Sequence, residues 1–230
     1  MTPHRPWIHR FATVAAGAAL ACAVPSTEAG TIRGQVDLSA AGTSSAARAN
    51  PYPGRANSMA GGGERGRGGA GETVILLAKL PAGVAVVPPP ATARPALEQK
   101  QQAFAPRVLA VQAGTTVVFP NRDPVYHNVF SVSPAKRFDL GKYSQGHSRS
   151  VRFDKPGIVN VYCDIHSDMA AWVYVVPHHA FAQANAAGKF SLPELPAGHY
   201  VLEAWHPDRG TRKVEVDVPA RGDVPVTVRY

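Results

Sequence analysis

The amino-acid sequence predicts an all-β protein, built as a β-sandwich that is followed by a smaller β-module. Three observations support this prediction. The chain of 230 residues contains 21 Gly and 21 Pro, which is typical of an architecture with many loops and turns. Short β-branched and aromatic runs follow one another closely from residue 106 onward, as they do in β-sandwiches. We find no 3.6-residue hydrophobic period of useful helical length.

The N-terminal segment is typical of a secretory signal peptide. Arg5 and Arg10 precede an apolar, Ala-rich stretch from Phe11 to Val24. Small residues follow, and we expect cleavage at Ala29, with Ala23 as an alternative. The apolar stretch has about 14 residues, too few for a comfortable membrane span of about 20. We therefore expect export to the periplasm without stable membrane insertion.

The segments before Pro177 that carry the apolar patterns of strands define the main sandwich. They are residues 31–38, 73–78, 107–111, 115–119, 125–132, 148–153, 158–162 and 172–176. Two stretches between them are expected to be loops. Residues 39–71 are rich in Gly, Ala and Ser, cannot bury a core and should be flexible. Residues 81–105 are rich in Pro and Gln.

The chain after Pro177 has a strand rhythm of its own. The expected strands there are residues 180–182, 188–192, 195–205, 211–218 and 224–230. A module of about 50 residues is marginally stable alone, so we expect it to pack on the main sandwich. The predicted organisation is a signal peptide over 1–29, a main domain over 30–177 with a flexible insertion at 39–71, and a β-module over 178–230.

Both sulfur-containing residues of the predicted fold fall in one seven-residue window. Cys163, His166 and Met169 stand at three-residue intervals. The other cysteine, Cys22, lies in the signal segment, and an alternative in which it is lipidated has a poor local sequence match. Export places Cys163 in an oxidising compartment without a partner for an internal disulfide. It is therefore either a reactive thiol or a ligand.

An imidazole upstream of this window completes a set of metal-binding side chains. His127 lies beside a strand end, in the run Asp-Pro-Val-Tyr-His-Asn. Two His, one Cys and one weak axial Met form the donor set of a blue-copper electron-transfer site. The alternative is that these residues are unrelated, since a buried Cys is usually an inert apolar residue. The spacing of the donors around a turn between two strands favours the ligand interpretation.

Residues 104–176 resemble the cupredoxins. The segments Phe119–Asp123, His127–Ser131 and Tyr162–Cys163 carry the resemblance. The Cys-x2-His-x2-Met loop is similar to the short ligand loop of amicyanin, and the overall pattern is similar to plastocyanin-like proteins of methylamine utilisation. The resemblance implies a Greek-key β-sandwich that binds one type 1 copper. The implied copper ligands are His127, Cys163, His166 and Met169.

The resemblance also implies roles for residues around the metal. Asn128 would brace the two ligand loops, and its surroundings would hydrogen-bond the thiolate. His166 would be the ligand at the solvent edge, through which electrons leave. Tyr162 would offer a second route through the thiolate, although an ordinary strand aromatic explains this residue equally well.

Residues 179–230 resemble the carboxypeptidase regulatory-like, transthyretin-like β-modules. The segments Gly188–Tyr200 and Ala204–His206 carry this second resemblance. It implies a structural or interaction module without catalytic residues.

Together these features predict a periplasmic type 1 copper protein that carries single electrons between redox partners, such as a c-type cytochrome or a dehydrogenase. Two alternatives stay open: a copper chaperone or storage protein with the same donors, and a metal-free structural or interaction protein. The formal net charge of +8 favours an acidic redox partner, and no nucleic-acid-binding motif is present. An enzyme is not expected, because the chain has one donor set and no catalytic triad or phosphate loop.

Overall fold

The computed structural model describes residues 29–39 and 68–230. The expected signal peptide before Ala29 and positions 40–67 of the expected insertion lie outside these residues. The described part of the chain consists of strands, turns and one short 3-10 helix, η2 (Ala70–Glu72), which confirms the all-β prediction. It contains no helix with the length and apolar character that crossing a membrane requires.

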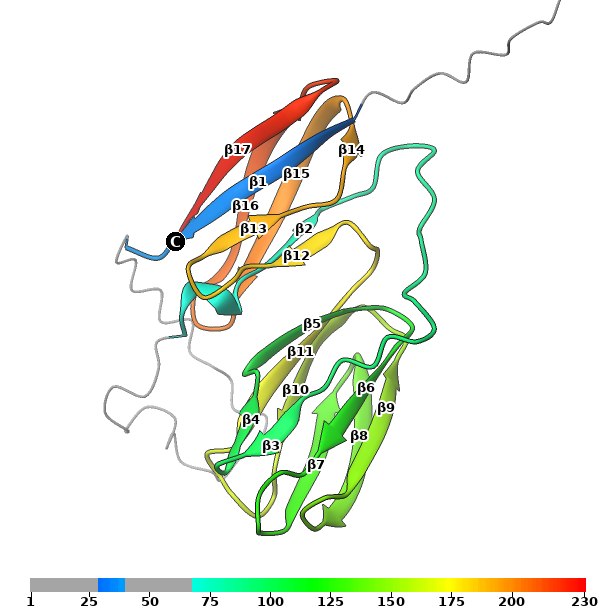
Figure 1. Cartoon of the computed structure of the whole chain (residues 1–230), viewed down its shortest axis with the longest axis vertical. Helices are drawn as coiled ribbons and strands as arrows, with labels where there is room; N and C mark the ends of the chain where they lie inside the picture. The colour runs from blue at the N-terminus through cyan, green and yellow to red at the C-terminus, as the bar shows by residue number, and fades with distance from the viewer. Residues whose placement is uncertain (1–28, 40–67) are drawn as a thin grey trace, which may run out of the picture.

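Two β-sandwiches lie one above the other in Figure 1. The lower one, which we call the central sandwich, has a sheet in the order β5-β11-β10-β7-β8 and two further strand pairs, β6-β9 and β3-β4. Its strands are β3 (Glu98–Lys100), β4 (Ala103–Ala105), β5 (Val108–Gln112), β6 (Thr115–Pro120), β7 (His127–Ser133), β8 (Lys136–Tyr143), β9 (Ser148–Phe153), β10 (Gly157–Tyr162) and β11 (Ala170–Val176).

The upper one, which we call the terminal sandwich, is built from both ends of the described chain. One sheet has the order β13-β1-β14 with β17 parallel to β1, and the other has the order β12-β2-β15-β16. Its strands are β1 (Ala29–Asp37), β2 (Val74–Leu77), β12 (Phe181–Gln183), β13 (Lys189–Ser191), β14 (Leu195–Pro196), β15 (Gly198–His206), β16 (Gly210–Val218) and β17 (Gly222–Arg229). The central sandwich is therefore inserted between β2 and β12.

The pairing of β1 and β2 differs from the expected division of the chain. The sequence predicts both strands but assigns them to the domain 30–177, whereas both pair with strands of the segment 178–230. Ile32 of β1 and Ile75 of β2 are fully buried in the terminal sandwich. A strand pattern shows which side chains are buried but not which strand lies alongside. The segment after 178 is also too small to bury a sufficient core alone, and β1 and β2 supply the missing apolar surface.

Two further elements were not expected from the sequence. The hairpin of β3 and β4 lies inside the stretch 81–105, and β8 lies in a region without a strand prediction. Each strand of the hairpin has three residues, of which only the middle one, Gln99 or Phe104, is buried. In β8 only the last residue, Tyr143, is buried. The hairpin strands, each with a single buried side chain, have no hydrophobic period to detect. In β8, Phe138 and Leu140 also pack against the core but are only half-buried.

Strand β2 lies between two apolar clusters. Its Ile75 and Leu77 pack into the terminal core, while Val74 and Leu76 face a cluster between the two sandwiches. The partners of Val74 and Leu76 in that cluster are Val108, Val176 and Trp205. Successive strand residues point to opposite faces, so burial on both faces explains the unbroken apolar run of this strand.

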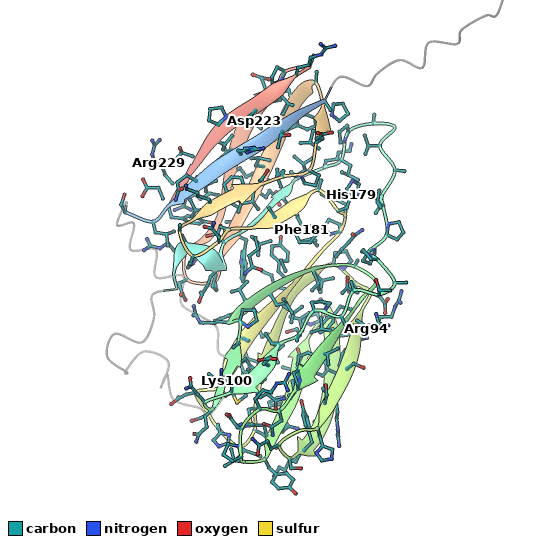
Figure 2. The ribbon with its side chains drawn as sticks, viewed as in Figure 1. Arg94, Lys100, His179, Phe181, Asp223 and Arg229 are labelled. Carbon is teal, nitrogen blue, oxygen red and sulfur yellow. The ribbon has the colours of Figure 1, made fainter. Side chains whose placement is uncertain are left out.

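Polar contacts reinforce the junction of the two sandwiches. The Arg107 guanidinium forms ion pairs with Glu72 and, at 3.1 Å, with Asp208. It also lies 4.6 Å from the ring centroid of Trp172, a cation–π distance. Phe181, labelled in Figure 2, packs against the apolar cluster beside these groups. The junction therefore combines apolar burial with paired charges.

The core of the central sandwich extends to the predicted ligand window. Along β10 the side chains of Val159 and Val161 are fully buried, and Cys163 continues this inward row with 1% exposure. Phe119 and Phe153 fill the same cluster and have no exposed surface. Burial of an apolar side chain of this size contributes about 1.5–3 kcal/mol. The thiol thus belongs to a cluster of fully buried side chains.

Candidate metal centre

The four predicted ligands lie at neighbouring strand ends of the central sandwich. His127 is the first residue of β7, and Cys163 follows the last residue of β10. His166 lies in the connection from β10 to β11, and Met169 directly precedes β11. Because β10 pairs with both β7 and β11, the ladder brings these positions together from segments that are 36 residues apart.

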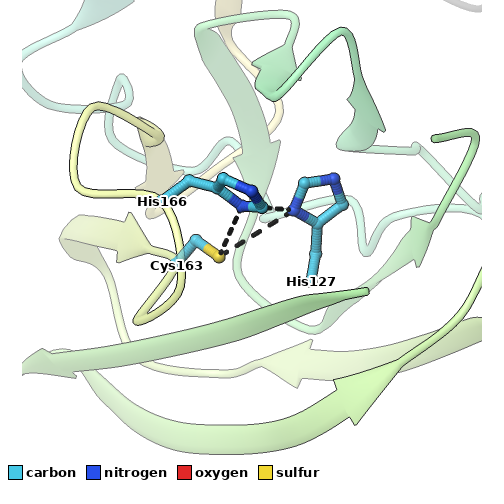
Figure 3. A group of neighbouring side chains, drawn as sticks. All are labelled: His127, Cys163 and His166. Atoms are coloured by element: carbon cyan, nitrogen blue, oxygen red, sulfur yellow. Dashed lines mark hydrogen bonds between the residues drawn. The ribbon is translucent and has the colours of Figure 1, made fainter. Parts of the chain in front are cut away.

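Three of the predicted ligands aim their donor atoms at one another (Figure 3). The Nδ1 atoms of His127 and His166 are 3.0 Å apart, and Cys163 Sγ lies 4.0 Å from the first and 3.8 Å from the second. A point equidistant from the three atoms is about 2.1 Å from each, close to the ~2.0–2.3 Å bonds that His nitrogen and Cys sulfur form with a metal such as zinc. The triangle therefore has the size of a metal site.

The three donors differ in their exposure to solvent. His127 has no exposed surface and Cys163 has 1%, whereas His166 is half-buried. Its neighbour Ile165 is 41% exposed. His166 is thus the donor closest to the molecular surface. This asymmetry agrees with the role at the solvent edge that the sequence resemblance implies for it.

Met169 closes the ligand loop through its backbone. Its N–H donates to the carbonyl of His166 at 3.1 Å, and its carbonyl accepts from the N–H of Cys163 at 3.2 Å. Its side chain is 1% exposed and packs in the same apolar cluster as Cys163. The three-residue spacing thus forms a compact turn held by two hydrogen bonds. The thioether of Met169 stays a predicted fourth ligand.

A buried carboxylate lies behind His127. Asp123 Oδ2 is 2.8 Å from His127 Nε2, the ring nitrogen that faces away from the triangle, and Asp123 is only 6% exposed. The same carboxylate accepts from the backbone N–H groups of Gln101 at 2.5 Å and Gln102 at 2.8 Å. These two residues form the tip of the β3–β4 hairpin. The hairpin is therefore connected to the candidate metal centre.

The hydrogen bonds keep Asp123 charged. Burial alone would raise the pKa of its carboxyl group, but hydrogen bonds from the Gln102 backbone, the His127 side chain and the Gln101 backbone outweigh this effect. The pKa of Asp123 is therefore lower than its usual value, because each donor stabilises the ionised form.

Asn128 makes a different contact from the one that the resemblance implies. Its Nδ2 donates to Asp139 Oδ1 of β8 at 2.7 Å, rather than to the loop that carries Cys163. Its Oδ1 is buried without a hydrogen-bond partner among the described residues. A register irregularity between Asn128 and Phe130 in the β7–β8 ladder places Asp139 within reach. Asn128 thus braces β7 against β8.

Sequence reasoning identified the donor atoms but missed the group behind them. Asp123 stands four residues before His127, and this spacing alone is too common to indicate contact. Its place is set by Asn121, whose Oδ1 accepts from the Asp123 N–H at 2.9 Å and whose Nδ2 donates to the carbonyls of Val125 and Tyr143. The contact between Asp123 and His127 depends on this folded loop. The four-residue spacing in the sequence therefore does not predict it.

The fold and the site thus define an all-β protein with a His–Cys–His donor triangle, of which His127 and Cys163 are buried. No protein-family model matches the chain, and neither does any curated protein. Among solved structures, a mutant of amicyanin with Cu(I) shows 21% identity over 36% of this chain and 82% of its own, with a TM-score of 0.34.

Two further solved structures show likeness of a similar extent. A purple cupredoxin from Nitrosopumilus maritimus has 28% identity over 33% of this chain and 84% of its own, with a TM-score of 0.31. A copper-containing nitrite reductase from Thermus scotoductus SA-01 has 25% identity over 42% of this chain and 25% of its own, with a TM-score of 0.35.

Proposed function

We propose that this protein is a periplasmic electron carrier with one type 1 copper ion. The observation that carries the proposal is the triangle of Cys163 Sγ and the Nδ1 atoms of His127 and His166, whose size suits a metal ion. Copper, when bound, would supply the redox chemistry, because it can exist as Cu(I) and Cu(II). Cys163 would hold it through a soft thiolate, His127 and His166 through their imidazoles, and Met169 through a weaker thioether.

The packing around the donors supports electron transfer rather than substrate chemistry. His127 and Cys163 are closed off from solvent, and two backbone hydrogen bonds hold the loop between Cys163 and Met169. Rigid ligands limit the rearrangement between the two oxidation states, which is what a carrier needs. Among the described residues, these three donors form the one group of side chains that could hold a metal ion. We therefore propose an electron carrier and not an enzyme.

The exit for electrons is proposed at His166. This ligand is half-buried, and the exposed apolar residues Val125, Tyr126 and Ile165 stand next to the ligands in the chain. A redox partner that docks there would approach the metal through the imidazole of His166. The net charge of +8 favours a partner with an acidic surface, such as a c-type cytochrome or a dehydrogenase.

The proposal is tested by loading the purified protein with copper. We expect one copper per chain and an intense blue colour from charge transfer between Cys163 and the metal. A colourless copper-loaded protein would contradict the proposal. Cys163→Ser should abolish the colour, whereas Ser167→Ala, in the same loop but outside the donor set, should keep it.

Voltammetry separates an electron carrier from a copper-handling protein with the same donors. A carrier should give a reversible one-electron wave and retain its copper in both oxidation states. A chaperone or storage protein should bind Cu(I) tightly, release it to an acceptor and show no reversible wave. The second pattern would replace electron transfer by copper handling as the function of this site.

A further inference from the structure

The ligand His127 is held on the side opposite the triangle by Asp123. A neutral imidazole carries one proton on one of its two nitrogens. The carboxylate of Asp123, 2.8 Å from Nε2, is an acceptor and requires the proton on Nε2. The lone pair of Nδ1 then faces Cys163 and His166. The hydrogen-bond network thus assigns the tautomer of His127 that can bind a metal.

In addition to the contact with Asn121, an unusual turn holds the carboxylate of Asp123. Gln101 and Gln102 have φ values of 56° and 54°, a left-handed conformation that is unfavourable for residues other than Gly. Their consecutive N–H groups both reach the carboxylate of Asp123. Strained residues of this kind persist only where the surrounding structure holds them.

The rest of the hairpin is attached to the same loop. Gln99 is fully buried and forms a parallel bridge with Asn121, and its carbonyl accepts from the Arg122 N–H at 2.8 Å. Residues 121–123 therefore run alongside the hairpin as far as the carboxylate. A chain of contacts leads from the hairpin tip through Asp123 to the imidazole of His127.

We propose that Asp123 is a positioning residue of the metal centre, which fixes His127 with Nδ1 free for the metal and favours Cu(II) over Cu(I) through its negative charge. The first part of this proposal, the tautomer of His127, also applies to the metal-free protein. The second part, the preference for Cu(II), rests on the proposed copper function. A carboxylate hydrogen-bonded to a ligating imidazole increases the basicity of that ligand. The higher charge of Cu(II) benefits more from this than Cu(I) does.

Asp123→Asn is the variant that tests this inference, because it removes the charge and changes the volume little. The amide can no longer accept from His127, Gln101 and Gln102 together, since one of its two polar atoms is a donor. We expect the affinity for Cu(II) to fall about 10–100-fold, with a smaller loss for Cu(I). Each tenfold fall in the ratio of the two affinities raises the reduction potential by about 59 mV.

Asp164→Asn is the matched control. Asp164 is next to Cys163 in the chain and exposed, so this variant removes the same charge close to the metal without touching His127. We expect its potential to stay near that of the unmodified protein. An equal shift in both variants would overturn the proposal, because it would show a general effect of charge. An unchanged potential in Asp123→Asn would overturn the redox part as well.

The metal-free protein provides a readout that is independent of copper. In nitrogen-15 NMR spectra His127 should carry its proton on Nε2, and this proton should exchange slowly with water. Asp123→Asn should populate the form with the proton on Nδ1. If the unmodified protein already carries the proton on Nδ1, the tautomer part is overturned, even when the variant fails to fold. A protein that shows the expected tautomer but no blue colour would support the positioning by Asp123 and contradict the proposed function.

Discussion

The chemistry of the candidate site depends on one soft atom, the sulfur of Cys163. Strand β10 delivers it into the core at 1% exposure, beside two imidazole nitrogens at 3.8 and 4.0 Å. The susceptibility of a free Cys to oxidation follows its accessibility to solvent. Burial therefore protects this thiol, and the short turn to His166 places the sulfur beside an imidazole nitrogen.

Met169→Leu tests the predicted axial ligand at the scale of one residue. Leu has a similar volume, so we expect the free energy of unfolding to change by less than about 1.5 kcal/mol. We expect the variant to remain blue and its reduction potential to change, because the weak axial ligand tunes the potential of such a site. The measurement is voltammetry of both proteins. An identical potential would exclude a role of the thioether as ligand.

His206 makes the stability of the protein depend on pH. Its side chain has no exposed surface, and its Nε2 donates to the carbonyls of Gly68 and Gly69. Burial is the main cause that lowers its pKa below the usual 6.5, and the charges of Arg209 and Arg107 act in the same direction. Above pH 6.5 the imidazole is neutral in both the folded and the unfolded chain. As the pH falls below 6.5, the unfolded chain takes up the proton first, so stability is lost.

His206→Gln should therefore lose less stability on acidification than the unmodified protein. The measurement is the free energy of unfolding in denaturant at pH 8 and at pH 5. His147→Gln, at an exposed turn of the central sandwich, is the control and should keep the full pH-dependent loss. An equal loss in His206→Gln and the unmodified protein would show that other groups cause it.

At the scale of elements, the contact between β1 and β13 depends on a glycine. Gly34 lies opposite Phe190 in this ladder, and a Cβ at Gly34 would stand 2.1 Å from the Phe190 ring. The ring thus occupies the space that any other residue at position 34 would need. Phe190 is 7% exposed and belongs to the core of the terminal sandwich. The absence of a side chain at Gly34 allows the two strands to share this core.

Gly34→Ala should destabilise the protein by about 1–3 kcal/mol, the usual cost of overpacking. Gly69→Ala is a matched control, because its Cβ would meet no atom within 4 Å. Its effect should stay below about 0.5 kcal/mol. Chemical denaturation measures both variants. The blue colour of the folded Gly34→Ala protein should be unchanged, since β1 belongs to the terminal sandwich, and a loss of colour would contradict this partition.

At the scale of the whole molecule, the central sandwich is an insertion in the terminal sandwich. The predicted ligands His127, Cys163, His166 and Met169 all come from the inserted part. The strands that close the terminal sandwich come from before and after it. The two parts meet at the cluster around Val108, Val176 and Trp205. The chain therefore crosses between the two sandwiches twice, once after β2 and once before β12.

Fragment 30–177 tests this architecture. It contains β1 and β2 without the strands that pair with them, so Ile32, Ile75 and Leu77 lose their cover. We expect proteases to cut within β2 in this fragment and to leave a resistant core of the central sandwich that still binds copper. In the full chain β2 should resist. Protection of β2 in the fragment would support the division at Pro177 instead.

The sequence alone determined the all-β class, most of the strands and the candidate ligands. Each of these depends on residues that are close together in the chain. Strands appear as short apolar patterns, and Cys163, His166 and Met169 appear as metal-binding residue types at a spacing that one turn can bring together. The structure brings together the donors of His127, Cys163 and His166, as their spacing predicts.

Only the tertiary structure decided which strands share a sheet and what lies behind His127. β1 and β2 close the terminal sandwich, and the β3–β4 hairpin holds Asp123 against the imidazole. The contact between Asp123 and His127 joins two side chains four residues apart. The other contacts join segments that are distant in the chain, and their donors are backbone N–H groups. The sequence pattern shows that such groups must find partners, but the path of the folded chain selects the partners.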